Sequence, residues 1–175
     1  IMASELILVY NYKNLGNALE YRKEKLDQKI ICFDFMSHKH LKKLGISRVS
    51  FSGPLQIGKC QILGKGYVGM VVLAKQNRNL VALKIRRIDS PRKNMSNEAK
   101  LLQIVNKLGI GPKFIKNSKN FLVMEYIDGE KIIDWAKKTE TKSQEVRSLL
   151  NYVLRECYIL DDAGFYHGEL TTIDK

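Results

Sequence analysis

The chain has 175 residues, 45% of them hydrophobic, and its 30 Lys and Arg against 18 Asp and Glu give a formal net charge of +12. This length and composition suffice for one folded domain, or for a small domain with an appendage, and no apolar run approaches the ~20 residues that span a bilayer. We therefore expect a protein without membrane association, whose excess of positive charge suits either a polyanionic partner or a solvated lysine-rich surface.

The first 45 residues predict a helical appendage. A short apolar run at Glu5–Tyr10 opens it, and a set of apolar residues then recurs at the spacing of an amphipathic helix: Leu15, Leu19, Leu26 and Ile30. Ser37 is a candidate cap for a further short helix that stops at Gly45. Because Lys and Arg exceed Asp and Glu in this segment, association with RNA or ribosomes through a basic surface stays open as an alternative.

Residues 46–127 have the turn signals and apolar runs of a β-sheet. Four strands are predicted in succession: Val49–Phe51, Leu55–Leu63, Tyr67–Lys75 and Leu80–Arg87. A helix pattern follows Pro91 and stops at Gly109, because glycine readily ends a helix. Short runs at Phe114–Ile115 and Phe121–Tyr126 predict two more strands. The sequence thus predicts a helix inserted into a succession of strands.

Residues 128–175 predict helices. A short helix is expected around Trp135, and a longer one follows with its apolar residues on one face: Val146, Leu149, Leu150, Val153, Leu154, Cys157 and Leu160. This longer helix is predicted to end near Gly164. The chain's cysteines, Cys32, Cys60 and Cys157, are scattered and lack C-x-x-C spacing, so they predict reduced thiols in the cytoplasm rather than metal ligands or disulfides.

The most specific pattern is a glycine run, Gly64-Lys65-Gly66-Tyr67-Val68-Gly69-Met70-Val71, with Lys84 at the end of the following apolar run. Glycines let backbone amides approach phosphate oxygens, because any Cβ would hold the backbone away. A lysine on the neighbouring strand can supply a fixed positive charge to the same phosphates. The pattern therefore predicts a nucleotide site, with ATP as its ligand.

Two further glycine-rich nucleotide motifs agree less well with the residues around this run. A Rossmann fingerprint requires a helix after the last glycine and an acidic residue about 20 positions further on. Here Val71–Ala74 predicts a strand, and the residue 20 positions after Gly64 is Lys84. A Walker loop needs Ser or Thr after its lysine, but Lys65 is followed by Gly66. A hairpin whose glycines serve the turn alone is the structural alternative.

The order of these features resembles the protein-kinase fold: an antiparallel sheet, a helix inserted after the lysine strand, a strand ending in Met124-Glu125-Tyr126, and then helices. The resemblance implies an α+β chain in which residues 46–127 are a small lobe with a glycine-rich loop. Residues 128–175 would be the start of a helical large lobe, and residues 1–45 the preceding appendage. The resemblance also implies that the large lobe is incomplete in these 175 residues.

The same resemblance implies roles for the residues that match kinase motifs. Lys84 would pair with the α- and β-phosphates of ATP, and Glu98, early in the inserted helix, would hold Lys84 in place. A surface glutamate in a first helical turn is the alternative for Glu98. The implied nucleotide-binding residues are Leu63, Gly64, Lys65, Gly66, Tyr67, Val68, Gly69, Val71, Ala82, Lys84, Met124, Glu125, Tyr126 and Ile127.

His167-Gly168-Glu169-Leu170 is similar to the catalytic-loop motif H-R-D-L of that fold, with glycine for arginine and glutamate for aspartate. The resemblance implies that Glu169 is the catalytic base and that Asp174, five residues later, is a ligand of Mg²⁺. The D-F-G sequence that would hold the metal is absent from these residues. Either the C-terminal part has been lost, which we favour, or the chain truly ends here and cannot turn over. In these 175 residues we expect nucleotide binding with little or no phosphoryl transfer.

The H-G-E-L form is similar to RIO kinases and to aminoglycoside and choline phosphotransferases. The strings Ala82–Arg92, in which Lys-Ile-Arg-Arg precedes Asp-Ser, and Ile110–Pro112 resemble a group of small predicted archaeal serine/threonine kinases, distantly similar to the RIO group. These resemblances imply a cytoplasmic serine/threonine protein kinase that uses ATP and Mg²⁺ on an unidentified protein substrate. A small-molecule kinase, and a non-catalytic nucleotide-binding module associated with RNA or ribosomes, are the alternatives.

Overall fold

The computed structural model of the chain describes residues 40–57, 60–87, 90–138 and 142–165. Most of the predicted appendage, the predicted base Glu169 and the predicted metal ligand Asp174 lie outside the described residues. Residues 40–43 are helical, and Gly45 follows them with a φ of 77°. Glycine adopts this left-handed conformation without strain, so the predicted stop at Gly45 is confirmed.

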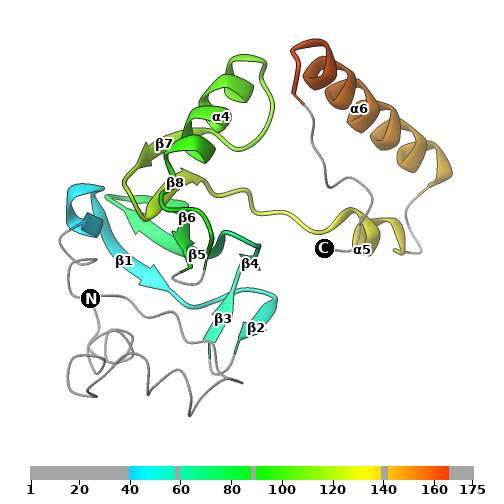
Figure 1. Ribbon diagram of the computed structural model, residues 1–175. Coiled ribbons are helices and arrows are strands. Elements are labelled where there is room, and N and C mark those ends of the chain that lie inside the picture. The colour runs from blue at the N-terminus through cyan, green and yellow to red at the C-terminus, as the bar shows by residue number, and fades with distance from the viewer. Residues whose placement is uncertain (1–39, 58–59, 88–89, 139–141, 166–175) are drawn as a thin grey trace. The chain divides into compact units, whose positions relative to one another are not determined.

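Strands fill the first part of the described chain and helices the last part (Figure 1). The strands are β1 (Ile46–Ser50), β2 (Leu55–Ile57), β3 (Cys60–Ile62), β4 (Gly64–Lys65), β5 (Gly69–Gln76), β6 (Asn79–Arg86), β7 (Phe114–Asn117) and β8 (Phe121–Glu125). The helices are α4 (Ser96–Lys107), α5 (Ile132–Ala136) and α6 (Ser143–Asp162). The structure is thus of mixed α and β type, and α4 is inserted between β6 and β7 as predicted.

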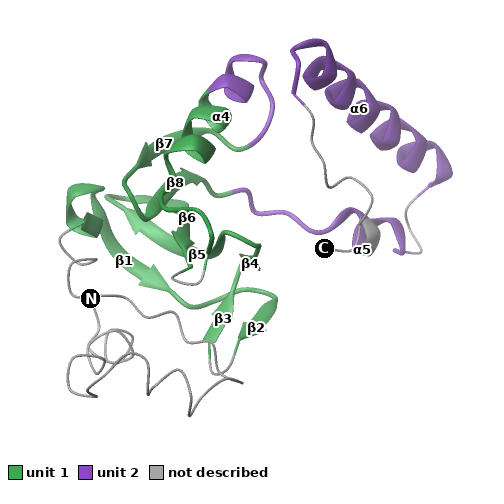
Figure 2. Cartoon of the chain, viewed as in Figure 1, with its two compact units in different colours: residues 1–103, 112–126 green, residues 104–111, 127–175 purple. Residues whose placement is uncertain are grey.

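The chain divides into two compact units (Figure 2). The first comprises Ile1–Gln103 and Pro112–Tyr126, and it contains every strand that the structure describes. The second comprises Ile104–Gly111 and Ile127–Lys175, with α5 and α6. Helix α4 begins in the first unit and ends in the second. Within the described ranges, none of the helices combines the length and the apolar character needed to cross a bilayer.

An antiparallel sheet of six strands is the centre of the first unit. Its strand order is β1-β5-β6-β8-β7, and β4 also pairs with β5. β5 and β6 are paired along their whole length, and Asn77 stands in the turn between them with a φ of 55°. Asparagine tolerates this left-handed conformation better than most residues, which allows the tight turn. The predicted strands that correspond to β1, β5, β6, β7 and β8 are confirmed, with ends shifted by a few residues.

The predicted single strand Leu55–Leu63 is wrong. β2 and β3 form a separate antiparallel hairpin, while β4 pairs with β5. Gly53, in the loop before the hairpin, lies very close to Ile62 of β3: a Cβ on Gly53 would lie 2.3 Å from the carbonyl oxygen of Ile62. The edge of β5 is therefore shared: β4 lies opposite residues 70–71, and β1 lies opposite residues 73–76.

Alternation along the strands gives the sheet two different faces. The larger buried cluster takes every second residue of the central strands: Met70, Val72, Ala74, Val81, Leu83, Ile85, Phe121 and Val123. The residues between them lie on the opposite face. A smaller cluster includes Leu122, from that opposite face, and packs Met95 and Ala99 at the start of α4 against the sheet.

The helix boundaries follow from local signals. Before α4, the side-chain oxygen Oδ1 of Asn94 accepts a hydrogen bond from the Ser96 amide at 2.9 Å, which satisfies a donor at the helix start. Gly109 and Gly164 have φ values of 80° and 77° and follow the last residues of α4 and α6. The predicted stops at both glycines are confirmed, because this left-handed conformation ends a helix.

Two of the three cysteines lie within the described residues. Cys60 and Cys157 are free and half-buried, and burial raises the pKa of the Cys60 thiol above its usual value. A raised pKa reduces the thiolate fraction at neutral pH and with it the reactivity of the sulfur. Cys32 lies outside the described residues.

Candidate functional site

The predicted adenine and phosphate residues share one face of the sheet. Val71 lies opposite Lys84 in the pairing of β5 with β6, and Ala82 lies opposite Met124 in the pairing of β6 with β8. Strand alternation places these side chains on the face opposite the larger buried cluster. Ala82 is buried, while the other three are half-buried. The strand registers thus bring together residues that are up to 53 positions apart in the sequence.

The glycine run forms the connection from β4 to β5. The Gly66 amide donates a hydrogen bond to the Gly69 carbonyl at 2.8 Å and closes the loop. At its tip Tyr67 is 74% exposed, whereas Val68 is buried in the smaller cluster beneath α4. The Val68 carbonyl also accepts a hydrogen bond from the Arg87 amide at 2.9 Å. The side chain and carbonyl of Val68 therefore anchor the loop to the sheet and α4.

The glycines of this run serve different purposes. A Cβ on Gly69 would lie 2.6 Å from the carbonyl oxygen of Ile85 on the neighbouring strand, so the fold itself requires glycine there. Among the described residues, a Cβ on Gly64 would meet nothing within 4 Å, and one on Gly66 would meet only the Gly69 carbonyl, at 3.8 Å. Neither Gly64 nor Gly66 has a positive φ. Neither packing within the described part of the chain nor backbone conformation therefore accounts for glycine at these two positions.

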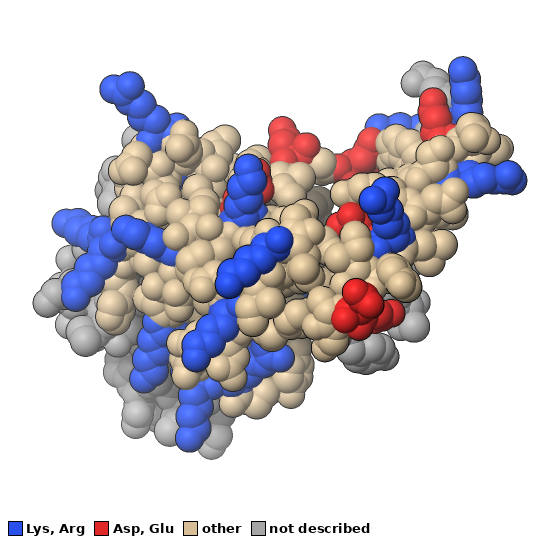
Figure 3. All heavy atoms as spheres, turned by 90° about the horizontal axis from the view of Figure 1, so that it is seen from above, with Lys and Arg blue, Asp and Glu red and all other residues tan. Residues whose placement is uncertain are grey.

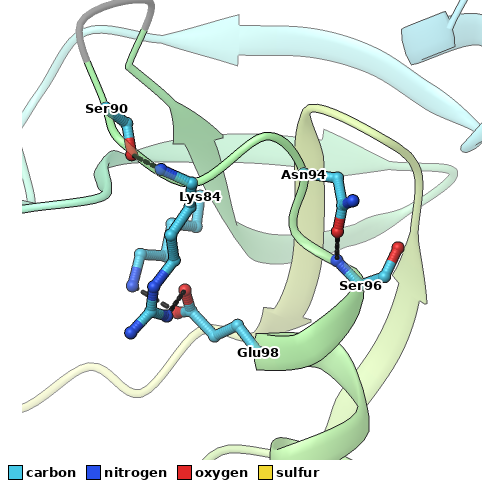
Figure 4. Close-up of polar contacts among 6 residues, drawn as sticks. Lys84, Ser90, Asn94, Ser96 and Glu98 are labelled. Atoms are coloured by element: carbon cyan, nitrogen blue, oxygen red, sulfur yellow. Dashed lines mark hydrogen bonds and ion pairs between the residues drawn. The ribbon is translucent and has the colours of Figure 1, made fainter.

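Lys84 and Glu98 form an ion pair between β6 and the first turn of α4 (Figure 4). The ammonium Nζ contacts the carboxylate oxygen Oε1, and the two side chains are 21% and 23% exposed. The helix presents Glu98 here because Ala99, the next residue, is buried against the sheet. Partial burial reduces screening of the attraction by solvent and salt. The predicted contact between the two residues is thus present. Glu98 is therefore not a freely exposed surface glutamate, which was the alternative.

A second cation next to this pair was not predicted from the sequence. Arg92 Nη1 lies 3.9 Å from the other carboxylate oxygen of Glu98, Oε2. That oxygen is buried and has no hydrogen-bond partner among the described residues. Glu98 therefore stands between two cations, one on each oxygen. The sequence holds no signal for this contact, because Arg92 lies in the loop before α4, where no periodicity assigns direction to a side chain.

The predicted adenine-binding segment has well-defined backbone partners. The Glu125 amide donates to the Lys113 carbonyl at 2.9 Å, and the Glu125 carboxylate oxygen Oε2 accepts from the Lys113 amide at 3.0 Å. The Glu125 side chain thus ties β8 to the start of β7. Tyr126 is half-buried, and Ile127, which belongs to the second unit, is 64% exposed.

Two further predicted residues border the glycine hairpin. The Leu63 amide donates a hydrogen bond to the Val71 carbonyl at 3.0 Å, which continues the pairing of β4 with β5 by one residue. Lys65, opposite Met70 in that pairing, is exposed. Both residues therefore hold positions fixed by the hairpin, with the Lys65 side chain available to solvent.

The catalytic base and the metal ligands are not placed by the structure. His167, Gly168, Glu169 and Asp174 lie outside the described residues. Within the described ranges there is no group of three or more His, Cys, Asp or Glu side chains that could hold a metal ion. The assignments of Glu169 and Asp174 therefore stay predictions.

Charge is distributed unevenly between the two parts of the chain. Residues 40–103 and 112–126, of the unit with the sheet, contain 16 Lys and Arg against three Asp and Glu, whereas the residues of the other unit contain eight against ten. Both described acids of the sheet unit are engaged, Glu98 with Lys84 and Glu125 with the Lys113 amide. On the face shown in Figure 3, Lys and Arg side chains project from much of the surface. The positive charge of the protein thus belongs to the unit that carries the sheet.

Comparison with known proteins finds structural similarity, but no family model and no curated protein matches the chain. Among solved structures, it is similar to the complex of streptomycin, ATP and APH(2")-IIa, with 22% identity and a TM-score of 0.41. That alignment covers 62% of this chain, which spans 34% of the length of the other. A likeness of this extent does not decide the activity of this chain, and the case for function therefore depends on the residues themselves.

Proposed function

We propose that this chain carries the nucleotide-binding part of an ATP-dependent phosphotransferase with a protein-kinase-like small lobe. The observation that carries the proposal is the Lys84–Glu98 ion pair on the sheet face next to the glycine hairpin. A lysine held by a carboxylate, beside a glycine loop, is the arrangement that positions nucleotide phosphates in kinases. The element order supports it, since hairpin, lysine strand, inserted helix and two further strands follow one another as in that lobe.

The residues present fit an ATP molecule. Packing within the described structure does not require glycine at positions 64 and 66. Phosphate oxygens that approach the backbone there would explain why both residues are glycine. Lys84 would neutralise α- and β-phosphate charge, and Glu98 would keep its ammonium in position. Val71, Ala82 and Met124, on the same face, would form the apolar surface against adenine. These residues bind and orient the nucleotide.

The reacting end of the site depends on residues that are predicted from the sequence alone. We infer that Glu169 accepts the proton of the substrate hydroxyl and that Asp174 contributes to the metal site. When bound, Mg²⁺ would offset charge between the β- and γ-phosphates. The described residues support nucleotide binding through the Lys84–Glu98 pair and the glycine run, whereas turnover depends on Glu169 and Asp174.

We further propose a cytoplasmic serine/threonine protein kinase, with a small-molecule kinase as the alternative. The test is transfer of radiolabelled γ-phosphate, by the chain alone and by a form extended with its native downstream sequence if one exists. Acceptors would be mixed proteins, an aminoglycoside and choline. We expect label on protein serine or threonine in the extended form, lost on Glu169→Gln, and little transfer by the short chain. Label on the small molecules alone would support the alternative. A lack of nucleotide binding in both forms would contradict the whole proposal.

A second candidate function, RNA binding, is supported by the charge of the sheet unit. Within this unit, residues 40–103 and 112–126 hold 16 Lys and Arg against three Asp and Glu, which would attract a polyanion. With about four phosphates contacted, the affinity for a single-stranded RNA should fall roughly 50-fold between about 50 and 200 mM salt, because released counterions oppose binding. Filter binding across salt concentrations measures this. The double variant Lys116→Glu with Lys119→Glu should reduce affinity, whereas Lys137→Glu, in the second unit, should not. Salt-independent binding would contradict it.

A further inference from the structure

The loop from β6 to α4 is organised by one arginine. Arg86 Nη1 donates hydrogen bonds to the carbonyls of Arg87, at 3.1 Å, and of Arg92, at 3.2 Å. Its Nε donates to Asn120 Oδ1 at 3.0 Å. One guanidinium thus contacts the carbonyls of Arg87 and Arg92 and connects them to Asn120 in the turn between β7 and β8. The hydrogen bond from Arg86 Nη1 to the Arg92 carbonyl holds the Arg92 backbone in place before α4.

Ser90 lies within that loop, among cationic residues. Its amide donates to the Arg87 carbonyl at 3.2 Å, and its hydroxyl Oγ accepts from the Arg92 amide, also at 3.2 Å (Figure 4). Ser90 is half-buried, but Arg92 and Lys93 beside it are exposed. The hydroxyl oxygen is therefore close to the backbone of Arg92, in a surface loop whose sequence has Arg87, Arg92 and Lys93 near Ser90 and one acid, Asp89, directly before it.

Arg92 connects this loop to the candidate nucleotide site. Its guanidinium lies 3.9 Å from Glu98 Oε2, a buried oxygen without a hydrogen-bond partner in the described part of the chain. The other oxygen of Glu98 contacts Lys84. At this distance Arg92 offers charge without a direct hydrogen bond, and its side chain is 55% exposed. A stronger anion near Arg92 would therefore compete with Glu98 for the guanidinium.

We propose that Ser90 is a phosphorylation site, and that its phosphate lowers the affinity for nucleotide by drawing Arg92 away from Glu98. This inference depends on the proposed nucleotide site. In the modification, Ser90 Oγ forms a bond to the γ-phosphorus of ATP, the bond to the β,γ-bridging oxygen breaks, ADP leaves, and the hydroxyl proton passes to a base or to water. The transferring enzyme is this protein or another kinase.

Two consequences of the phosphate act in the same direction. A phosphoserine carries a charge of about −1.5 to −2 and can take two guanidinium hydrogen bonds, so it attracts Arg92 more strongly than Glu98 does at 3.9 Å. Glu98 is then balanced by Lys84 alone, and the Lys84 ammonium is less available to nucleotide phosphates. The added negative charge also opposes a bound triphosphate. Both effects weaken ATP binding.

The test places phosphoserine genetically at position 90, so that it needs no kinase activity of the chain. We expect the dissociation constant for ATP, measured by calorimetry, to rise about tenfold relative to the unmodified protein, in the usual range of coupling between two sites. Phosphoserine at Ser52, an exposed residue after β1, is the matched control and should change little. In an Arg92→Ala background, phosphoserine 90 should lose most of its effect. Thermal unfolding of each form verifies folding.

A second measurement asks whether the modification occurs. Mass spectrometry of the protein, both isolated from its native cells and incubated with ATP, should find phosphate on the peptide that contains Ser90. Equal ATP affinities for phosphoserine 90 and phosphoserine 52 would overturn the proposed effect, and absence of phosphate from both samples would overturn the proposed site. Failure of the unmodified protein to bind ATP would instead contradict the proposed function, so the two failures are distinguishable.

Discussion

Replacing Lys84 by methionine should lower the affinity for ATP by about 10- to 100-fold, equivalent to roughly 1–3 kcal/mol for a lost charge-assisted contact. Methionine has nearly the length of the lysine stem but no charge, so the sheet face stays filled while the contact to phosphate is lost. Isothermal calorimetry of both proteins with ATP measures the change. The control is Lys116→Met on the edge strand β7, where an exposed lysine is removed without expected effect.

Measuring adenosine as well as ATP distinguishes a lost phosphate contact from a general loss of nucleotide binding. Because adenosine has no phosphates, its affinity should be the same for the native protein and for Lys84→Met, while affinities for ADP and ATP should fall. Glu98→Gln should weaken ATP binding less than Lys84→Met, because it leaves the lysine charge in place and removes only its partner. Equal affinities for ATP in the native protein and in Lys84→Met would contradict the assignment of Lys84 to the phosphates.

Alanine substitutions in the glycine run should separate folding from binding. At Gly69 an added Cβ would lie 2.6 Å from the Ile85 carbonyl oxygen and 3.3 Å from Lys84 Cγ, so β5 and β6 must move apart. Overpacking of this kind costs about 1–3 kcal/mol. We therefore expect Gly69→Ala to lower the free energy of unfolding by that amount. Chemical denaturation followed by circular dichroism measures it.

Gly66→Ala is the matched control, because its Cβ would lie 3.8 Å from the nearest carbonyl, an ordinary contact distance. The free energy of unfolding should change by less than about 0.5 kcal/mol, as for most surface substitutions. ATP affinity should nevertheless fall, since the methyl group would hold the loop backbone away from the phosphates. Unchanged affinity together with unchanged stability would indicate that this glycine serves the turn alone. Equal stability of the two variants would refute the steric assignment of Gly69.

Several features of the fold could be predicted from the sequence because local rules determine them. Apolar runs and intervening turn residues predicted β5 and β6, and the helical spacing after Pro91 predicted α4. Gly109 predicted its end, since a left-handed residue cannot continue a helix. The contact between Lys84 and Glu98 was also predictable, although only through the order of motifs that resembles the kinase fold.

Other features were decided by contacts between distant segments. The sequence predicted a single strand at Leu55–Leu63, but close approach of Gly53 to Ile62 accompanies two short strands, and β1 then pairs with part of the edge of β5. Val68 is one of the residues that the kinase resemblance assigns to the nucleotide, but its side chain is buried in the smaller cluster with Met95 and Ala99. For the pairing of β1 with β5 and for the packing of Val68, the partner is far along the chain, so no local pattern records it.

The sequence by itself thus determined which residue types stand near one another along each strand, and hence the glycine hairpin and the lysine strand. Only the tertiary structure decided that Gly69 serves packing whereas Gly64 and Gly66 do not. It also decided that Glu98 lies between two cations, because Arg86 fixes the Arg92 backbone through a guanidinium that reaches Asn120, 34 residues away. Periodicity determines which way a side chain points from a strand or helix. Loops have no period, and there the direction of Arg92 follows from hydrogen bonds that form only once the sheet is assembled.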